Sequence, residues 1–155
     1  MGSGLDDIDR GILYHLQLDA HQPISDIADA VGVANNTVRN RIRKLQETGV
    51  IQGFTIDLDY GRADIQHHYL ILCTVKITER EHITEEAAAI PGIVRSMTVM
   101  TGQQNVLVEV VAASRSELFE IASSLFELGL RVEREHLIWS VRKQAYSGFN
   151  AERSG

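Results

Sequence analysis

The residue types best suited to recognising another molecule lie in one short segment of the chain. Between positions 35 and 44 the sequence carries amides, a hydroxyl and cations without an acidic residue. The candidates are Asn35, Asn36, Thr37, Arg39, Asn40, Arg41, Arg43 and Lys44. Asn can pair with the edge of adenine and Arg with that of guanine, whereas Thr and Lys more often meet phosphate or a thymine methyl. This segment therefore predicts a surface that contacts double-stranded DNA.

Hydrophobic spacing predicts three helices in the first third of the chain. Their buried stripes are Ile8, Ile12, Leu13 and Leu16, then Ile24, Ile27, Ala28 and Val31, then Val38, Ile42 and Leu45. Asp6 is placed to cap the first helix and Gly32 to end the second. A turn of two or three residues then leads into the third helix, at about 35–48. Two helices joined by a tight glycine turn, the second carrying the cations, are typical of a helix-turn-helix.

A plain solvated helix surface is the alternative interpretation of the Asn and Arg side chains. The short turn and the acid-free basic run together favour DNA binding. Arg41 points nearer the core side of its helix, so we expect a salt bridge or a phosphate contact from it rather than base reading. Residues 49–57 then change to strand-forming types and resemble the wing or connecting strand of a winged helix.

In this order and spacing the N-terminal residues resemble the Lrp/AsnC family of prokaryotic transcriptional regulators. The matching residues are Leu5, Asp6, Asp9, Ile12, Leu13, Asp26, Ile27, Ala28, Val31, Gly32, Val33, Thr37, Val38, Arg41, Ile42, Leu45, Gly49, Val50, Ile51, Gly53 and Phe54. The resemblance implies a DNA-binding regulator with a C-terminal module that oligomerises and senses a ligand. It implies a homodimer, assembled in some members into a tetramer or octamer. Ala34 departs from the family, which commonly has a capping serine there, so Asn35 or Asn36 would have to supply the cap.

The second half of the sequence predicts a βαββαβ order, which is the ferredoxin-like unit of an α+β fold. The expected strands lie at about 69–75, 94–100, 106–112 and 132–145, with helices after Thr78 and Ser114. Because the strands are apolar on both alternations, we expect an identical subunit to cover the face that the helices leave open. The predicted domains are 5–56 (helix-turn-helix), 57–66 (linker), 67–146 (ferredoxin-like oligomerisation and effector domain) and 147–155 (tail).

The loop between the middle strands is the candidate effector site. In the resembling proteins it reads Thr-Gly-x-Tyr/Phe-Asp and borders an amino-acid pocket. This chain has Thr101, Gly102, Gln103, Gln104 and Asn105. Because Gln104 replaces the aromatic residue and Asn105 the acid, a ligand bound there is expected to be polar but not necessarily a simple amino acid. A hairpin loop without a ligand is the open alternative.

Two other classes of function compete with the regulator. Siroheme decarboxylases share both domains, but their His and Tyr residues are absent from 96–100 and 103–105, so we expect no enzyme and no cofactor. A metal- or redox-responsive regulator could use Cys73 with His67 or His68. Cys73 and His67 share one side of a strand but lie about 20 Å apart along it, so the ligands of an ion would have to come from two subunits.

Composition limits the location and source of the protein. The net charge is −6, and no apolar run reaches the length of about 18 residues that a membrane span needs, so we expect a cytoplasmic protein. The single cysteine, Cys73, excludes an intramolecular disulfide. Three lysines stand against twelve arginines and 21 acids, a bias typical of salt-adapted organisms such as haloarchaea and also of ordinary acidic proteins from genes rich in G and C.

Overall fold

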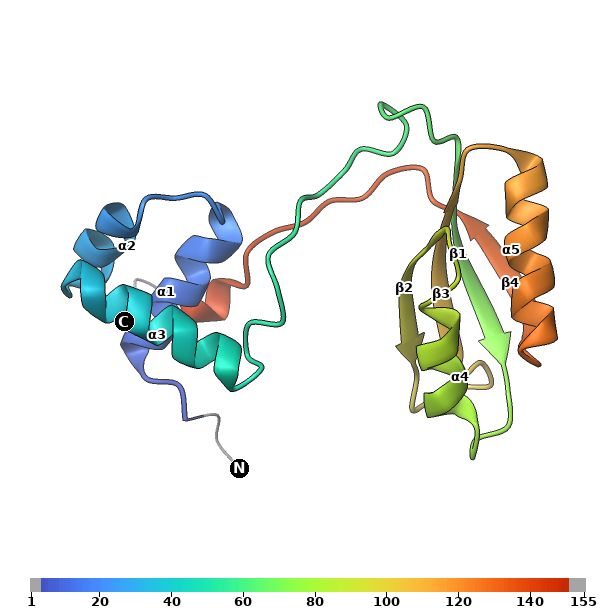
Figure 1. Cartoon of the computed structure of the whole chain (residues 1–155), viewed down its shortest axis with the longest axis horizontal. Coiled ribbons are helices and arrows are strands. Elements are labelled where there is room, and N and C mark those ends of the chain that lie inside the picture. The colour runs from blue at the N-terminus through green and yellow to red at the C-terminus, as the bar shows by residue number, and fades with distance from the viewer. Residues whose placement is uncertain (1–3, 151–155) are drawn as a thin grey trace. The chain divides into compact units, whose positions relative to one another are not determined.

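The computed structural model describes residues 4–150, which form two compact units (Figure 1). The first unit holds the N-terminal residues as far as Ile56 and, from Arg142 onward, the C-terminal segment. The second unit is Asp57–Val141. The sequence had placed 67–146 in one domain and 147–155 in a tail, whereas the structure groups 142–150 with the N-terminal helices. Residues 151–155 of that predicted tail lie outside the described residues.

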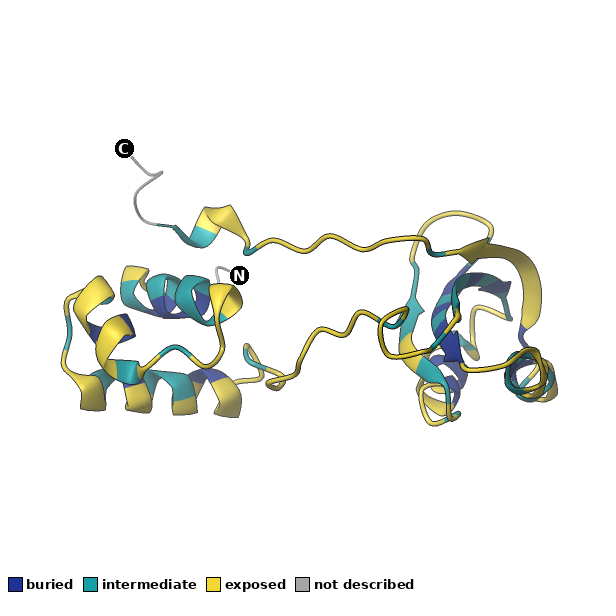
Figure 2. Cartoon of the chain, turned by 90° about the horizontal axis from the view of Figure 1, so that it is seen from above, coloured by how far each residue is buried: buried dark blue, intermediate teal, exposed yellow. Residues whose placement is uncertain are grey.

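Three helices build the first unit, as predicted: α1 (Asp7–Leu18), α2 (Ile24–Val31) and α3 (Asn35–Glu47). Their apolar stripes meet in one core, coloured dark blue in Figure 2 and formed by Ile12, Leu13, Ile27, Ala28, Val38 and Leu45. Gly11 allows α1 and α2 to come close, because a Cβ there would lie 2.7 Å from Cγ1 of Val31. No helix among residues 4–150 has the length and apolar composition needed to cross a membrane.

The C-terminal segment completes this small core. A short 3₁₀ helix, η1 (Ser147–Phe149), places the Phe149 ring against the apolar cluster of the three helices. The backbone N–H of Tyr146 donates to the side-chain oxygen of Gln17 in α1 at 3.2 Å, and the Tyr146 ring meets Phe149 edge-on. Residues from both ends of the sequence therefore hold the helical unit together.

The predicted wing is not a strand in this chain. After α3 the backbone turns at Gly49, where φ is 73°, and the N–H of Ile51 donates to the carbonyl of Leu45 at 3.0 Å. Residues 52–59 then run without regular secondary structure. A strand requires a neighbour for its backbone groups, and none of the described residues supplies one here.

The second unit has the predicted ferredoxin-like order. Its elements are β1 (His67–Thr74), α4 (Arg80–Ala87), β2 (Ile93–Thr98), β3 (Val106–Ala112), α5 (Arg115–Glu127) and β4 (Arg131–Leu137). The strands lie antiparallel in the order β2-β3-β1-β4. The last strand ends at Leu137, well before the predicted position 145. Its partner β1 begins at His67, only two residues beyond the Tyr69 that pairs with Leu137, and the N–H of Ile138 makes one further bond to the carbonyl of His68.

The two faces of the sheet differ. On one face α4 and α5 cover a buried core of Ile71, Cys73, Ile83, Ala87, Val106, Val108, Val110, Ala112, Ile121, Leu125 and Leu130. The open face carries the half-buried side chains of Leu70, Leu72 and Leu107. Beside them His68 contacts Glu109 at 2.7 Å, and Arg95 pairs with the same carboxylate at 3.4 Å. No described helix covers this second face.

Removal of the Phe149 ring should loosen the helical unit and leave the sheet unit unchanged. In Phe149→Ala we expect the free energy of local opening of α1 to fall by about 1–2 kcal/mol, roughly half the cost of deleting a fully buried ring. Hydrogen exchange of the amides in α1 gives the opening free energy of the helical unit, and exchange of the amides in β3 gives that of the sheet unit. Leu18→Ala, at an exposed position of α1, is the control and should change α1 by less than about 0.5 kcal/mol. Unchanged protection of α1 in Phe149→Ala would contradict the packing.

Candidate nucleic-acid interface

The turn between α2 and α3 fixes the candidate DNA-binding surface. Gly32 ends α2 with the left-handed φ of 72°, a conformation that costs glycine little, and its N–H donates to the carbonyl of Ala28. The N–H of Val33 donates to the same carbonyl at 3.0 Å. The third helix then begins at Asn35, so two helices joined by a tight turn are present as predicted. Neither Asn35 nor Asn36 takes over the cap, because Ala34 is the N-cap residue and the start of α3 has no side-chain capping hydrogen bond.

The outer face of α3 carries most of the predicted DNA-binding residues. Val38 and Leu45 are buried, while the exposed candidates are Asn35, Asn36, Arg39, Asn40, Arg43 and Lys44. Thr37 is half-buried. Among the described residues, no ion pair engages Arg39, Arg43 or Lys44. This surface therefore presents uncompensated positive charge beside amide groups.

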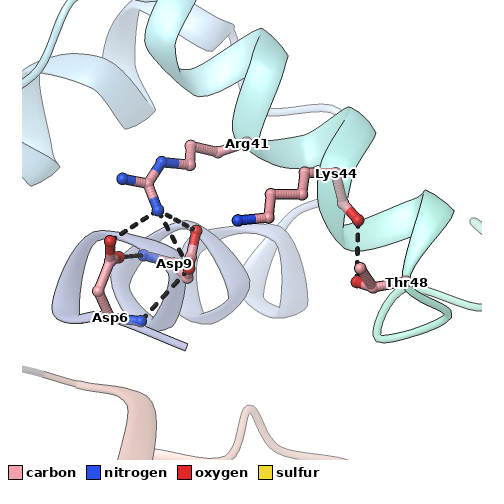
Figure 3. Close-up of polar contacts among 5 residues, drawn as sticks. All are labelled: Asp6, Asp9, Arg41, Lys44 and Thr48. Atoms are coloured by element: carbon pink, nitrogen blue, oxygen red, sulfur yellow. Dashed lines mark hydrogen bonds and ion pairs between the residues drawn. The ribbon is translucent and has the colours of Figure 1, made fainter. Parts of the chain in front are cut away.

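Arg41 differs from its neighbours on α3. Its Nη1 lies 2.6 Å from Oδ2 of Asp6 and 3.2 Å from both side-chain oxygens of Asp9, across to the start of α1 (Figure 3). Asp9 is 4% exposed. Asp6 and Asp9 also form a capping box, in which each side chain accepts from the other residue's backbone N–H. The salt bridge that the sequence analysis considered for Arg41 is present.

Electrostatics follow this geometry. The backbone N–H of Asp9, together with Arg41, lowers the pKa of the Asp6 carboxyl, because both stabilise its ionised form. The carboxylates of Asp6 and Asp9 in turn raise the pKa of Arg41, because they stabilise its charged form. The sequence had assigned Asp6 to the cap alone, and only the folded chain joins it to a residue 35 positions away. The sequence signal that could have found the capping box was the pair Asp6 and Asp9, because two such side chains three residues apart can each accept from the other's backbone N–H.

The predicted effector loop splits into two parts. Thr101, Gly102 and Gln103 are exposed and Gln104 is half-buried, but Asn105 is 8% exposed. The Asn105 side chain accepts from the N–H of Val75 at 3.0 Å and donates to the carbonyl of Val75 at 2.8 Å. Its amide is therefore engaged in holding the end of β1. The absence of an acid at this position accordingly says little about ligand binding.

The residues of the metal and redox alternative are not brought together. Cys73 lies in the core beneath the helices, where burial together with Glu133 and Glu135 raises the pKa of its thiol to about 12. His67 stands at the other end of β1 with its ring stacked on Tyr69. A thiol with such a pKa is almost entirely protonated at neutral pH and is a weak nucleophile and metal ligand. No described residues form a group of three or more metal-binding side chains.

Comparison with known proteins identifies the family. Residues 5–46 match the model of the AsnC-type helix-turn-helix domain. The HTH-type transcriptional regulator FL11 of Pyrococcus horikoshii is 33% identical over 114 residues, which cover 74% of this chain and 75% of FL11. The regulator AldR of Mycolicibacterium smegmatis is 35% identical over 116 residues, covering 74% of this chain and 68% of AldR. The chain belongs to the Lrp/AsnC family.

Solved structures of Lrp/AsnC regulators share the fold. The leucine response regulatory protein LrpA of Mycobacterium tuberculosis superposes with a TM-score of 0.79 at 21% identity, over 92% of this chain and 100% of LrpA. The crystal structure of MtbAldR gives 0.78 at 22% identity, over 92% of this chain and 99% of the other. The predicted two-domain α+β fold and the DNA-binding regulator are thus confirmed, and the decarboxylase alternative gains no support.

Asn105 should act as a structural bracket whatever binds to the loop. Asn105→Ala removes both hydrogen bonds to Val75, so we expect the free energy of unfolding of the sheet unit to fall by about 2 kcal/mol. Urea unfolding measured through amide exchange of β3 gives this value. Gln103→Ala removes an exposed amide from the same loop and should cost less than about 0.5 kcal/mol. An equal loss of unfolding free energy in Asn105→Ala and Gln103→Ala would contradict the structural role of Asn105.

Proposed function

We propose that this Lrp/AsnC regulator reads its operator with α3 in the major groove. The observation that carries the proposal is the exposed side of α3 from Asn35 to Lys44, a stretch without an acidic residue that follows the turn of a helix-turn-helix. Asn36, Asn40 and Arg43 share the side opposite the buried Val38 and are assigned to base edges. Asn35, Thr37, Arg39 and Lys44 flank them and are assigned to phosphate and neighbouring contacts.

Charge distribution supports this orientation. The whole chain carries a net charge of −6, which by itself opposes binding to DNA. The basic residues of α3 lie in a stretch without acids that ends before Glu47, one turn after Arg43, and further acids crowd the start of α1. A duplex is therefore attracted to α3 and repelled by acidic surface elsewhere, which orients the approach.

We assign the open face of the sheet to self-association. Leu70, Leu72 and Leu107 form an apolar centre on this face, and polar groups border it. A second copy of the same face would cover the centre with matched chemistry in a two-fold dimer. The dimer then presents two α3 helices to half-sites about one helical turn apart, so the operator should be an imperfect palindrome. Tetramers or octamers would bend or wrap the DNA further.

A small polar effector is the regulatory part of the proposal. The exposed portion of the loop, 101–103, offers a hydroxyl, an amide and backbone groups to a ligand. A regulator from Neisseria meningitidis with this fold, at 16% identity and a TM-score of 0.72, is described as a complex with L-Met. Such a ligand would regulate this chain by binding one assembly state more tightly than another.

Variants of α3 should separate base contacts from phosphate contacts. Asn36→Ala and Asn40→Ala should each reduce the preference for operator over scrambled DNA by about tenfold, because a good base contact contributes about 1–3 kcal/mol of discrimination. Lys44→Ala should weaken both DNAs alike and reduce the slope of log affinity against log salt by about 0.9. Fluorescence anisotropy across a salt series measures these quantities, with a duplex selected by the wild-type protein from a random library.

Gln46→Ala is the matched control for these amides, because Gln46 is exposed on α3 but lies away from the proposed base-reading side. It should leave affinity and preference unchanged. An unaltered ranking of operator variants in both Asn36→Ala and Asn40→Ala would show that the recognition face is wrongly assigned. Failure of the wild-type protein to select any common sequence would remove the proposed function.

A charge on the open sheet face should dissociate the dimer. Leu72→Glu places an unpaired carboxylate at the apolar centre, and two-fold symmetry repeats the change in the second copy. We expect the dimer dissociation constant to rise at least about a hundredfold. Phe126→Glu, at an exposed position on the outer side of α5, is the control and should keep the wild-type mass. Light scattering after size-exclusion chromatography gives the masses, and the opposite pattern would assign the interface to α5.

A further inference from the structure

We propose that Asp6, Asp9 and Arg41 form a clamp that positions α3 for operator reading, and that Arg41 is a positioning residue rather than a DNA contact. The inference rests on the proposed function of α3. Three short contacts carry it, all made by Nη1 of Arg41 to carboxylate oxygens at the start of α1 (Figure 3). Arg41 lies in the middle of α3, between the assigned base-reading residues Asn40 and Arg43.

Burial makes the clamp obligatory. The Asp9 side chain is 6% exposed, and an ionised carboxylate with so little water requires a nearby cation or several hydrogen-bond donors. Its described partners are the backbone N–H of Asp6 at 3.3 Å and the guanidinium of Arg41. Displacement of α3 along α1 would withdraw the cation and leave the buried charge poorly compensated. The pose of α3 is therefore fixed by an interaction with a strict distance requirement.

Apolar packing alone would hold α3 less strictly. Val38 and Leu45 bury one side of α3, but hydrophobic contact is non-directional and tolerates small shifts and rotations. Hydrogen bonds to Arg41 are directional, and their acceptors are themselves held by the capping box of α1. The same two carboxylates thus cap the start of α1 and orient α3. Base readout needs this precision, because displacements of about 1 Å break bidentate contacts.

The charge of the cluster argues against a phosphate contact by Arg41. Two carboxylates face one guanidinium, so the group as a whole is negative. A phosphate placed there would be repelled by Asp6 and Asp9, whereas Arg39, Arg43 and Lys44 have no described acidic partner. The basic surface offered to DNA therefore excludes Arg41, although it lies on the same helix.

Asp9→Asn provides a test in which positioning and simple electrostatics predict opposite signs. The substitution removes a negative charge from a DNA-binding unit, so electrostatics alone predicts tighter binding to every duplex. Loss of the clamp predicts about tenfold weaker binding to the selected operator with little loss on scrambled DNA. Anisotropy titrations with both duplexes at several salt concentrations distinguish them. Unchanged or improved preference for the operator in Asp9→Asn would overturn the clamp.

Substitution of Arg41 is the second test of the clamp. Arg41→Gln should lose operator preference by about tenfold without a change in salt slope, because no phosphate contact is removed. A parallel loss on both duplexes, with the slope reduced by about 0.9, would show a phosphate contact and overturn the proposal. Arg41→Lys should retain most of the preference, since a single nitrogen makes all three contacts and an ammonium group can replace it.

Asp6→Asn keeps the test decisive if the other variants fail to fold. Asn is a good N-cap, so α1 is preserved while the 2.6 Å ion pair is lost. We expect about a threefold loss of operator preference, together with faster amide exchange at the contact between α1 and α3. An unchanged preference in a folded Asp6→Asn protein would overturn the clamp. If the wild-type protein itself shows no preference between the duplexes, the proposed function fails, which is a separate result.

Discussion

The helical unit is organised around the burial of one charge. Asp9 lies almost out of water, and the structure compensates it with Arg41 from the recognition helix and with the N–H of Asp6. Because that cation comes from α3, the proposed recognition helix cannot shift along α1 without losing this contact. The cap of one helix, the pose of the other and the charge pattern of the exposed surface all follow from the same contact.

The remaining stability of this unit comes from a small core. Three short helices bury few apolar side chains, and a domain of this size retains little free energy of folding beyond its conformational entropy cost. The chain supplements the core with Phe149, which arrives from the far end of the sequence. The sheet unit lies between these two segments in the sequence, so the chain links the units twice, before β1 and after β4.

The sheet unit divides its two faces between different tasks. Beneath the helices, burial together with Glu133 and Glu135 raises the pKa of the Cys73 thiol to about 12. This thiol therefore packs in the core and is a poor nucleophile at neutral pH. On the open face, apolar residues alternate with the His68, Glu109 and Arg95 cluster, a mixture typical of surfaces that associate. Asn105 holds Val75 at the end of β1, while Thr101, Gly102 and Gln103 of the same loop are exposed.

Local patterns determined much of this protein in advance. Period and capping residues gave the three helices, the glycine turn, the βαββαβ order and the exposed face of α3, because each depends on residues close together in sequence. Interactions between distant residues were decided only by the tertiary structure. The contact of Arg41 with Asp6 and Asp9, the packing of Phe149 on α1 and the bracket of Asn105 on Val75 each join separate segments. The early end of β4 also involves a distant segment, because its neighbour β1 begins at His67, only two residues beyond the Tyr69 that pairs with Leu137.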